Sequence, residues 1–180
     1  MDYRSHFLLL ADYNLRMNNQ LFDAARTLTA DEVCSDMGAF FDSILGTLNH
    51  LIVGDLIWLS RFSSHSDRYT SLLQLSELPV PQSLDHQVYP SLELLSVART
   101  RVDSSIRQWL LTEVDESDFI KPLTYKNTKG VVSERNFAEL VVHLFNHQTH
   151  HRGQITTLLN QRGVDAGVTD LLIEIRDLRG

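Results

Sequence analysis

The stretch AFFDSILGTLNHLIVGDLIWLSRF, residues 39–62, has apolar residues on nearly every face of a helix. Its interior carries only two formal charges, Asp42 and Asp55, and Gly46 lies opposite the main stripe of Leu, Ile and Phe. A helix that is apolar almost all round is buried by its neighbours. The stretch therefore predicts the central helix of a helical bundle.

Two further segments before and after it have the apolar periodicity of long helices. The first is residues 3–28, and the polar segment that follows it contains Thr29 and Asp31 as possible caps. The second is residues 90–110, with Pro90 at the first helical position, where its missing N–H costs nothing. Both have a polar face, so we expect them to pack around the central helix with one side toward solvent.

A fourth long helix is predicted over residues 136–162. Asn136 and Glu139 have the spacing of a capping box at its start, and Gly163 suits the left-handed residue after its end. A short fifth helix, DLLIEIRDL, is expected over residues 170–178.

The remaining segments are not helical in pattern. Residues 63–89 are rich in Ser, contain Pro79 and Pro81, and read as a long connection with one helical turn around Leu72–Leu75. Residues 119–133, FIKPLTYKNTKGVVS, predict a small β-hairpin. The sequence thus predicts an all-α fold: an up-and-down four-helix bundle with a short fifth helix and a hairpin-like excursion, in one domain of residues 1–180.

Composition excludes several classes of function. A net charge of -7 opposes binding to nucleic acid, which needs clustered cations. Cys34 is the one cysteine, so an intrachain disulfide and a Cys-rich zinc site are excluded, as suits a cytoplasmic protein. No apolar run approaches the ~20 residues of a membrane span, and no signal peptide is evident. We therefore expect a cytoplasmic protein without nucleic-acid or membrane partners.

The segment HLFNHQTHHRGQITTLL, residues 143–159, contains four of the eight histidines of the chain. At roughly 100° per residue, His151 falls within the apolar arc of the predicted helix and His147 lies on its flank. His143 is farther round, and His150 should face water. The two inward histidines are therefore His147 and His151.

Bond lengths limit how many of these imidazoles can share an ion. Metal–nitrogen bonds are ~2.0–2.1 Å, whereas residues eight apart on a helix are separated by ~12 Å along its axis. One pair at i, i+4 spacing can ligate together, and the inward pair is His147 and His151. His50, on the nearly uncharged central helix, is the candidate for a third ligand. Three neutral imidazoles with open positions are typical of a catalytic zinc, nickel or iron site. The alternative is a histidine cluster in a bundle that binds no metal.

Other residues have simpler interpretations. Asp55 is either a hydrogen-bonded buried carboxylate or a partner that orients a ligating imidazole. Trp58 and Trp109 are assigned to the core, and Cys34 is a small hydrophobe near a helix start. Arg152 is expected at the helix edge in solvent.

Known catalytic templates are missing. Gln148 stands where HxxxH zinc proteases have a general-base Glu, and the paired Glu-x-x-His segments of di-metal bundles are absent. A base, if one is needed, has to come from a residue outside these templates. The nominees are Asp12, Asp55 and His143.

The segments NHQTHHRGQITTLLNQRGVD and TDLLIEIRD resemble the carboxy-terminal signature of the DinB/YfiT-like family. In that family the pattern HxxxHRGQ provides two metal ligands, matched by His147 and His151, and a second-helix histidine, matched by His50, provides the third. The resemblance covers essentially the whole chain. It implies a bundle of four helices plus a short fifth, a homodimer, and a divalent metal held by three histidines.

The resemblance also implies a function. Related branches include thiol-dependent S-transferases and an isomerase that uses a low-molecular-weight thiol. We therefore expect a metal-dependent enzyme that activates a thiol or water for transfer to a small electrophile. The alternative is a non-catalytic, metal-binding and dimerising stress-response module.

Overall fold

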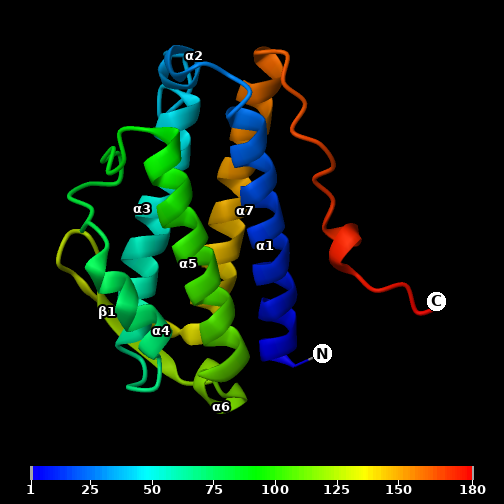
Figure 1. The fold of residues 1–180 in the computed structure, drawn as a ribbon. Coiled ribbons are helices and arrows are strands. Elements are labelled where there is room, and N and C mark those ends of the chain that lie inside the picture. The colour runs from blue at the N-terminus through cyan, green and yellow to red at the C-terminus, as the bar shows by residue number, and fades with distance from the viewer. Residues whose placement is uncertain (1, 180) are drawn as a thin grey trace.

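The computed structural model describes residues 2–179 as a bundle of four long helices (Figure 1). These are α1 (Tyr3–Ala25), α3 (Ile44–Ser63), α5 (Leu92–Thr112) and α7 (Phe137–Gln161). Helix α1 contacts α5 and α7, and α3 contacts both as well. The all-α class and the four-helix bundle are thus confirmed.

Helices α1 and α7 run in one direction along the bundle, and α3 and α5 run in the other (Figure 1). The connection between α3 and α5, residues 64–91, returns the chain along the outside of the bundle before α5 begins. We call this segment the crossover. The expected up-and-down order is modified at this step, because the crossover makes α3 and α5 parallel.

Side-chain caps explain where the helices begin. Helix α3 starts at Ile44, five residues after the expected position, because the Ser43 side chain accepts a hydrogen bond from Gly46 N. Residues 39–42 instead form a tight turn in which Asp42 has a φ of 61°. A Cβ at Gly46 would lie 2.1 Å from the Phe41 carbonyl oxygen, so only glycine allows this turn to close on the helix.

Apolar periodicity did not predict two short helices, α2 (Ala30–Cys34) and α6 (Glu116–Phe119). Thr29 caps α2 with a reciprocal capping box, which confirms its predicted cap role, although no helix was predicted over the polar segment itself. Helix α6 lies in the acidic segment after α5. Helix α5 begins at Leu92 with Ser91 as its N-cap, so Pro90 precedes the helix instead of opening it.

The crossover contains one helical turn, as expected, in α4 (Thr70–Leu73) followed by the 3₁₀ turn η1 (Gln74–Glu77). The Asn49 side chain on α3 fastens its far end by bonding the backbone N–H and carbonyl of Tyr89, at 2.9 and 3.0 Å. This contact matters for the site, because Asn49 is followed in the chain by His50.

The predicted hairpin is confirmed as the antiparallel pair β1 (Pro122–Lys126) and β2 (Val132–Asn136). Asn136 then caps α7 by accepting a hydrogen bond from Glu139 N at 3.0 Å. After α7 ends, Gly163 has a φ of 74°, the left-handed conformation expected there.

The expected fifth helix is shorter than predicted. It is a single 3₁₀ turn, η2 (Leu171–Glu174), held to α1 by an ion pair of 2.6 Å between Arg16 and Glu174. Its apolar pattern faces solvent instead of the core, which removes the burial that would support a longer helix. The exposed apolar side chains of this segment are Val168, Leu172, Ile173, Ile175 and Leu178.

A closed ring of buried polar side chains lies in the middle of the bundle and draws on all four long helices. Arg99 donates to Asp55 at 2.5 Å and to Asp103 at 2.7 Å, and Gln148 donates to Asp55 at 2.6 Å. Arg152 completes the ring by donating to Gln148 at 3.5 Å and to Asn14, whose amide donates to Asp103. The members are at most 4% exposed: Asn14, Asn18, Asp55, Arg99, Asp103, Gln148 and Arg152. Two carboxylates are balanced by two guanidinium groups, which is the condition for burying charges at tolerable cost.

Within residues 2–179, no helix is long and apolar enough to cross a membrane.

Candidate metal centre

The structure brings His50 together with His147 and His151, although His147 lies 97 residues after His50 in the chain. One ring nitrogen from each of the three lies within 4.8 Å of the other two. His50 projects from α3, and His147 and His151 project from successive turns of α7, which runs antiparallel to α3 (Figure 1). Bundle packing therefore converts the expected histidine cluster into a convergent set of three imidazoles.

His50 is held from both sides. Its Nδ1 lies 2.8 Å from the carbonyl oxygen of Leu84 in the crossover, and its ring stacks on Phe41 with centroids 3.8 Å apart. Because a carbonyl only accepts, the proton of the neutral imidazole is assigned to Nδ1. The lone pair of Nε2 is then free to bind a cation in the middle of the cluster.

His151 is oriented by its own helix. Its Nδ1 lies 2.7 Å from the Gln154 side-chain oxygen, one turn farther along α7. This contact likewise assigns the proton to Nδ1 and leaves Nε2 as the donor atom. Such partners of a ligating histidine fix its tautomer and ring orientation. The second glutamine of the segment HQTHHRGQ thus has a defined structural role.

His147 packs against the backbone of α3. A Cβ at Gly54 would lie 2.7 Å from His147 Cε1, so the ring occupies space that only glycine leaves open. Its Nε2 faces the Nε2 of His50 at 3.0 Å, and its Nδ1 is buried without a hydrogen-bond partner. Gly54 therefore allows the His147 side chain of α7 to approach the backbone of α3 closely.

Burial keeps all three imidazoles neutral. It lowers the pKa of His147 to about 3, aided by the nearby rings of His151 and His50. Burial also lowers the pKa of His50 and of His151, against the opposing hydrogen bonds to Leu84 and Gln154. Neutral imidazole is the form that binds metal, so the site is poised to accept a cation at neutral pH.

The donor set fits a divalent transition metal. Two nitrogens that each bind one ion at ~2.0–2.1 Å stand roughly 2.9–3.4 Å apart for bond angles of about 90–110°. The separation of 3.0 Å between the Nε2 atoms of His50 and His147 lies in that range. Three imidazoles leave further coordination positions open, as in catalytic sites.

The other two histidines of the cluster lie outside this set. His143 and His150 are both exposed. The ring of His143 lies 5.1 Å from that of Trp58 and 6.2 Å from that of His147, measured between centroids. The predicted outward direction of His150 is correct, and His143 is a neighbour of the site.

The structure decides between the alternatives for Asp55 and corrects the expectation for Arg152. Asp55 contacts Arg99 and Gln148 instead of an imidazole, so it is the hydrogen-bonded buried carboxylate of the two alternatives. Burial raises the pKa of its carboxyl, and the Arg99 guanidinium opposes that shift. Arg152 is 3% exposed instead of lying in solvent, because the ring of buried polar groups requires a second cation.

Three further residues differ from their expected positions. Asp12 forms a surface ion pair of 2.7 Å with Arg107, away from the histidines. Trp109 is fully buried as predicted, but Trp58 is only partly buried and its indole lies beneath the Arg61 guanidinium. Cys34 is exposed at the last position of α2. Of the three nominated bases, only His143 lies beside the site.

Cavities adjoin the cluster on two sides. One is lined by Phe40, Phe41, Asp85 and His150, together with His50 and His151. The other lies toward the hairpin and His147. The contributions of Leu84 and Phe41 could not be predicted from the sequence, because a backbone carbonyl and a loop phenylalanine have no recognisable sequence pattern. Small molecules can therefore approach the three imidazoles from either side.

The model of the DinB family matches residues 3–177, nearly the whole chain. The chain belongs to the DinB family. Protein DinB of Bacillus subtilis (strain 168) is 28% identical over 163 residues, which cover 89% of this chain and 88% of that protein. The resemblance inferred from the HxxxHRGQ pattern is thus confirmed. In this DinB-family member the residues of the pattern have different places in the structure. The two histidines lie in the cluster, Gln154 orients His151, and Arg152 belongs to the ring of buried polar groups.

Proposed function

We propose that this DinB-family protein is a single-domain metalloprotein in which His50, His147 and His151 hold one divalent ion of zinc, nickel or iron. The observation that carries the proposal is the facing pair of Nε2 atoms at 3.0 Å, with the His151 nitrogen completing the set. Leu84 and Gln154 fix the tautomers of two imidazoles so that lone pairs point at the same place.

The proposed activity is transfer of an activated thiol or water to a small electrophile. A bound divalent cation lowers the pKa of a thiol or water at an open position and so supplies a nucleophile at neutral pH. The protein's own residues shape the space around it. Phe41 stacks on one face of His50, and the Leu84 carbonyl in the crossover accepts a hydrogen bond from its Nδ1, so these two contacts fix the orientation of the ring. His143, beside His147 and exposed, is placed to accept a proton.

Elemental analysis tests the metal site directly. The wild-type protein should contain close to one divalent ion per chain, and His50→Ala, His147→Ala and His151→Ala should each lose most of it. His143→Ala and His150→Ala are matched controls from the same helix and should retain it. Metal content that is unchanged in the three variants, or absent from the wild type, contradicts the proposal.

Catalysis requires a separate measurement. The metal-loaded protein is assayed with low-molecular-weight thiols and an aryl halide, and turnover should disappear in His147→Ala. Stoichiometric metal without turnover would instead support the alternative, a non-catalytic metal-binding module. Under both alternatives, the enzyme and the non-catalytic module, we propose that the protein is a homodimer, with the exposed apolar residues around η2 in the interface. A mass of one chain in light scattering would refute the dimer.

A further inference from the structure

Arg61 is the cation that lines the cavity on the His147 side of the histidine cluster. This cavity, about 290 Å³ in volume, lies between α3, the β1–β2 hairpin and α7. We call it the hairpin pocket. Its wall includes His147, His143, Trp58, Arg61, Tyr125 and Asn127.

The Arg61 guanidinium is held by aromatic rings instead of by acids. Its central carbon lies 4.7 Å from the Trp58 ring centroid and 5.0 Å from that of Tyr125. Within residues 2–179, the structure gives this guanidinium no hydrogen bond and no ion pair. Arg68, the next arginine in the sequence, differs in this respect, since it pairs with Asp115 and Asp118. Arg61 thus presents five unused N–H donors in a fixed place.

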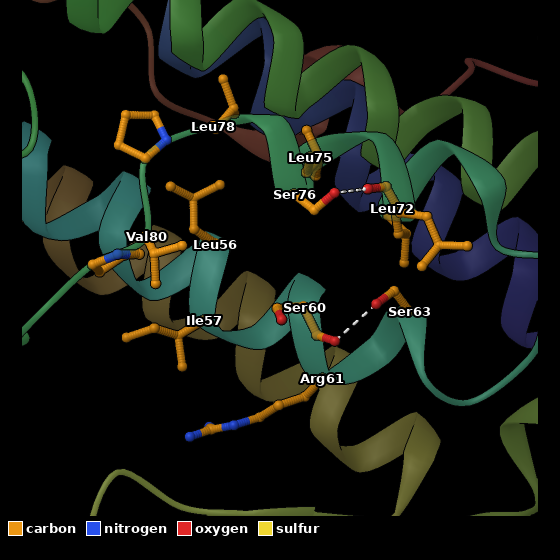
Figure 2. Close-up of a pocket in the computed structure, with 13 residues that line it drawn as sticks. Leu56, Ile57, Ser60, Arg61, Ser63, Leu72, Leu75, Ser76, Leu78 and Val80 are labelled. Atoms are coloured by element: carbon orange, nitrogen blue, oxygen red, sulfur yellow. Dashed lines mark hydrogen bonds between the residues drawn. The ribbon is translucent and has the colours of Figure 1, made fainter.

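Among the described residues, the walls of the two cavities that Arg61 lines contain no acidic side chain. No Asp or Glu is among the described residues that line the hairpin pocket. A second cavity of about 340 Å³ shares Ile57 and Arg61 with it and is otherwise walled by apolar residues and serines (Figure 2). Arg61 is partly buried, and this burial lowers the pKa of its guanidinium. A cation in this setting favours an anionic ligand.

The position of Arg61 relative to the cluster limits the size of that ligand. Helical side chains lean toward the helix N-terminus, and Figure 2 shows the Arg61 side chain extending alongside Ile57 and away from Leu72 and Leu75. Gly54, which touches His147, is two turns before Arg61, or ~10 Å along the axis, and the lean of the side chain shortens this to roughly 5–10 Å. That is the span of a small organic molecule.

We propose that the hairpin pocket binds a small organic carboxylate with an apolar body. The carboxylate pairs with Arg61, the body packs against Trp58, Tyr125 and Ile57, and the far end reaches His147. As the substrate subsite of a metal centre, the pocket rests on the function proposed above. Arg61 is a positioning residue, which selects the anionic substrate and directs its other end to the histidines.

Binding to the metal-free protein tests the role of Arg61 without the metal. The probes are 3-phenylpropionate and its neutral isostere 3-phenylpropanamide, measured by calorimetry. The acid should bind roughly tenfold or more tightly than the amide, as charge-assisted hydrogen bonds require. Arg61→Gln should remove this preference, and Arg61→Lys should retain part of it. Arg107→Gln, which changes a half-exposed arginine on α5, is the matched control and should leave it intact. Equal binding of acid and amide, or a preference that survives in Arg61→Gln, overturns the proposal.

Paramagnetic relaxation in the Mn²⁺-loaded protein tests the orientation. The aromatic protons of 3-phenylpropionate should relax faster than the methylene protons beside its carboxylate, because the carboxylate points away from the histidines. The reverse order means that the carboxylate binds the metal and refutes the arrangement. Failure to load any metal would refute the proposed function, whereas the comparison of acid and amide would still decide the role of Arg61.

Discussion

Replacing Gly54 by alanine should impair the proposed metal centre while leaving the bundle folded. The added Cβ would lie 2.7 Å from His147 Cε1, whereas ordinary contacts begin at 3.4 Å. The backbone of α3 is held by its packing against α5 and α7, but the His147 ring is the end of a rotatable side chain. The ring, and not the helix, should therefore give way.

The displacement of the His147 ring is large compared with the tolerance of a metal–ligand bond, but small enough for the surrounding core to accommodate. Restoring normal contact moves the ring by about 0.7 Å, compared with a tolerance of ~0.2 Å in metal–ligand distances. We expect metal affinity to fall by at least roughly 10–100-fold, the loss typical when a ligand's orientation is disturbed. Stability should change by less than about 1 kcal/mol, because the better helix propensity of alanine offsets the crowding.

Gly153→Ala is the matched control, since it is another helical glycine, in α7, and a Cβ there would meet nothing within 4 Å. It should raise stability by roughly 0.5–1 kcal/mol and leave metal affinity unchanged. Affinity is measured by competition with a chromophoric chelator, and stability by urea unfolding of the metal-free proteins. If Gly54→Ala binds metal as tightly as Gly153→Ala, then His147 either is not a ligand or is not positioned by α3.

Three further predictions follow from the contacts around the cluster. Gln154→Leu removes the partner of a ligand's Nδ1 and should weaken metal binding by roughly 10–100-fold, whereas Gln161→Leu, on the same helix, should not; equal affinities in chelator competition would exclude the orienting role. In the metal-free protein, His147 has a pKa of about 3 when folded and ~6.5 when unfolded, so stability is retained above pH ~6.5 and is lost as the pH falls toward 3. After allowance for its partial exposure this loss should be about 2–3 kcal/mol in urea titrations, and an unchanged slope in His147→Gln would contradict the assignment. Arg99→Met leaves two carboxylates buried without their cation and should destabilise the protein by about 3–5 kcal/mol; a cost below ~1 kcal/mol would show that the buried ring is not charged as described.

Apolar periodicity predicted the four long helices because burial of one face is what makes a helix stable in a protein. It failed at helix starts. Residues 39–41 continue the apolar pattern of α3, yet the Ser43 cap and the close approach permitted by Gly46 place them in a turn. It also failed for α2 and α6, which are too short to show a period.

The candidate site was predictable as far as single helices reveal it. Helical spacing selected His147 and His151, and the low charge of α3 pointed to His50, because each of these signals is local. The burial of Arg152 was not predictable in this way, since its partner Asn14 comes from α1 and the ring has members on all four long helices. The Leu84 carbonyl was invisible for a related reason, because any residue at that position supplies the same backbone oxygen.

The ring of buried polar groups has a consequence for how the molecule assembles. If any one of the four long helices were detached, at least one charged or amide group would remain buried among apolar side chains without its hydrogen-bond partner. The cost would be several kcal/mol. Partly folded states are therefore less stable than both the native and the unfolded state. The protein should fold in one cooperative transition, and detachment of any one long helix should unfold the whole bundle.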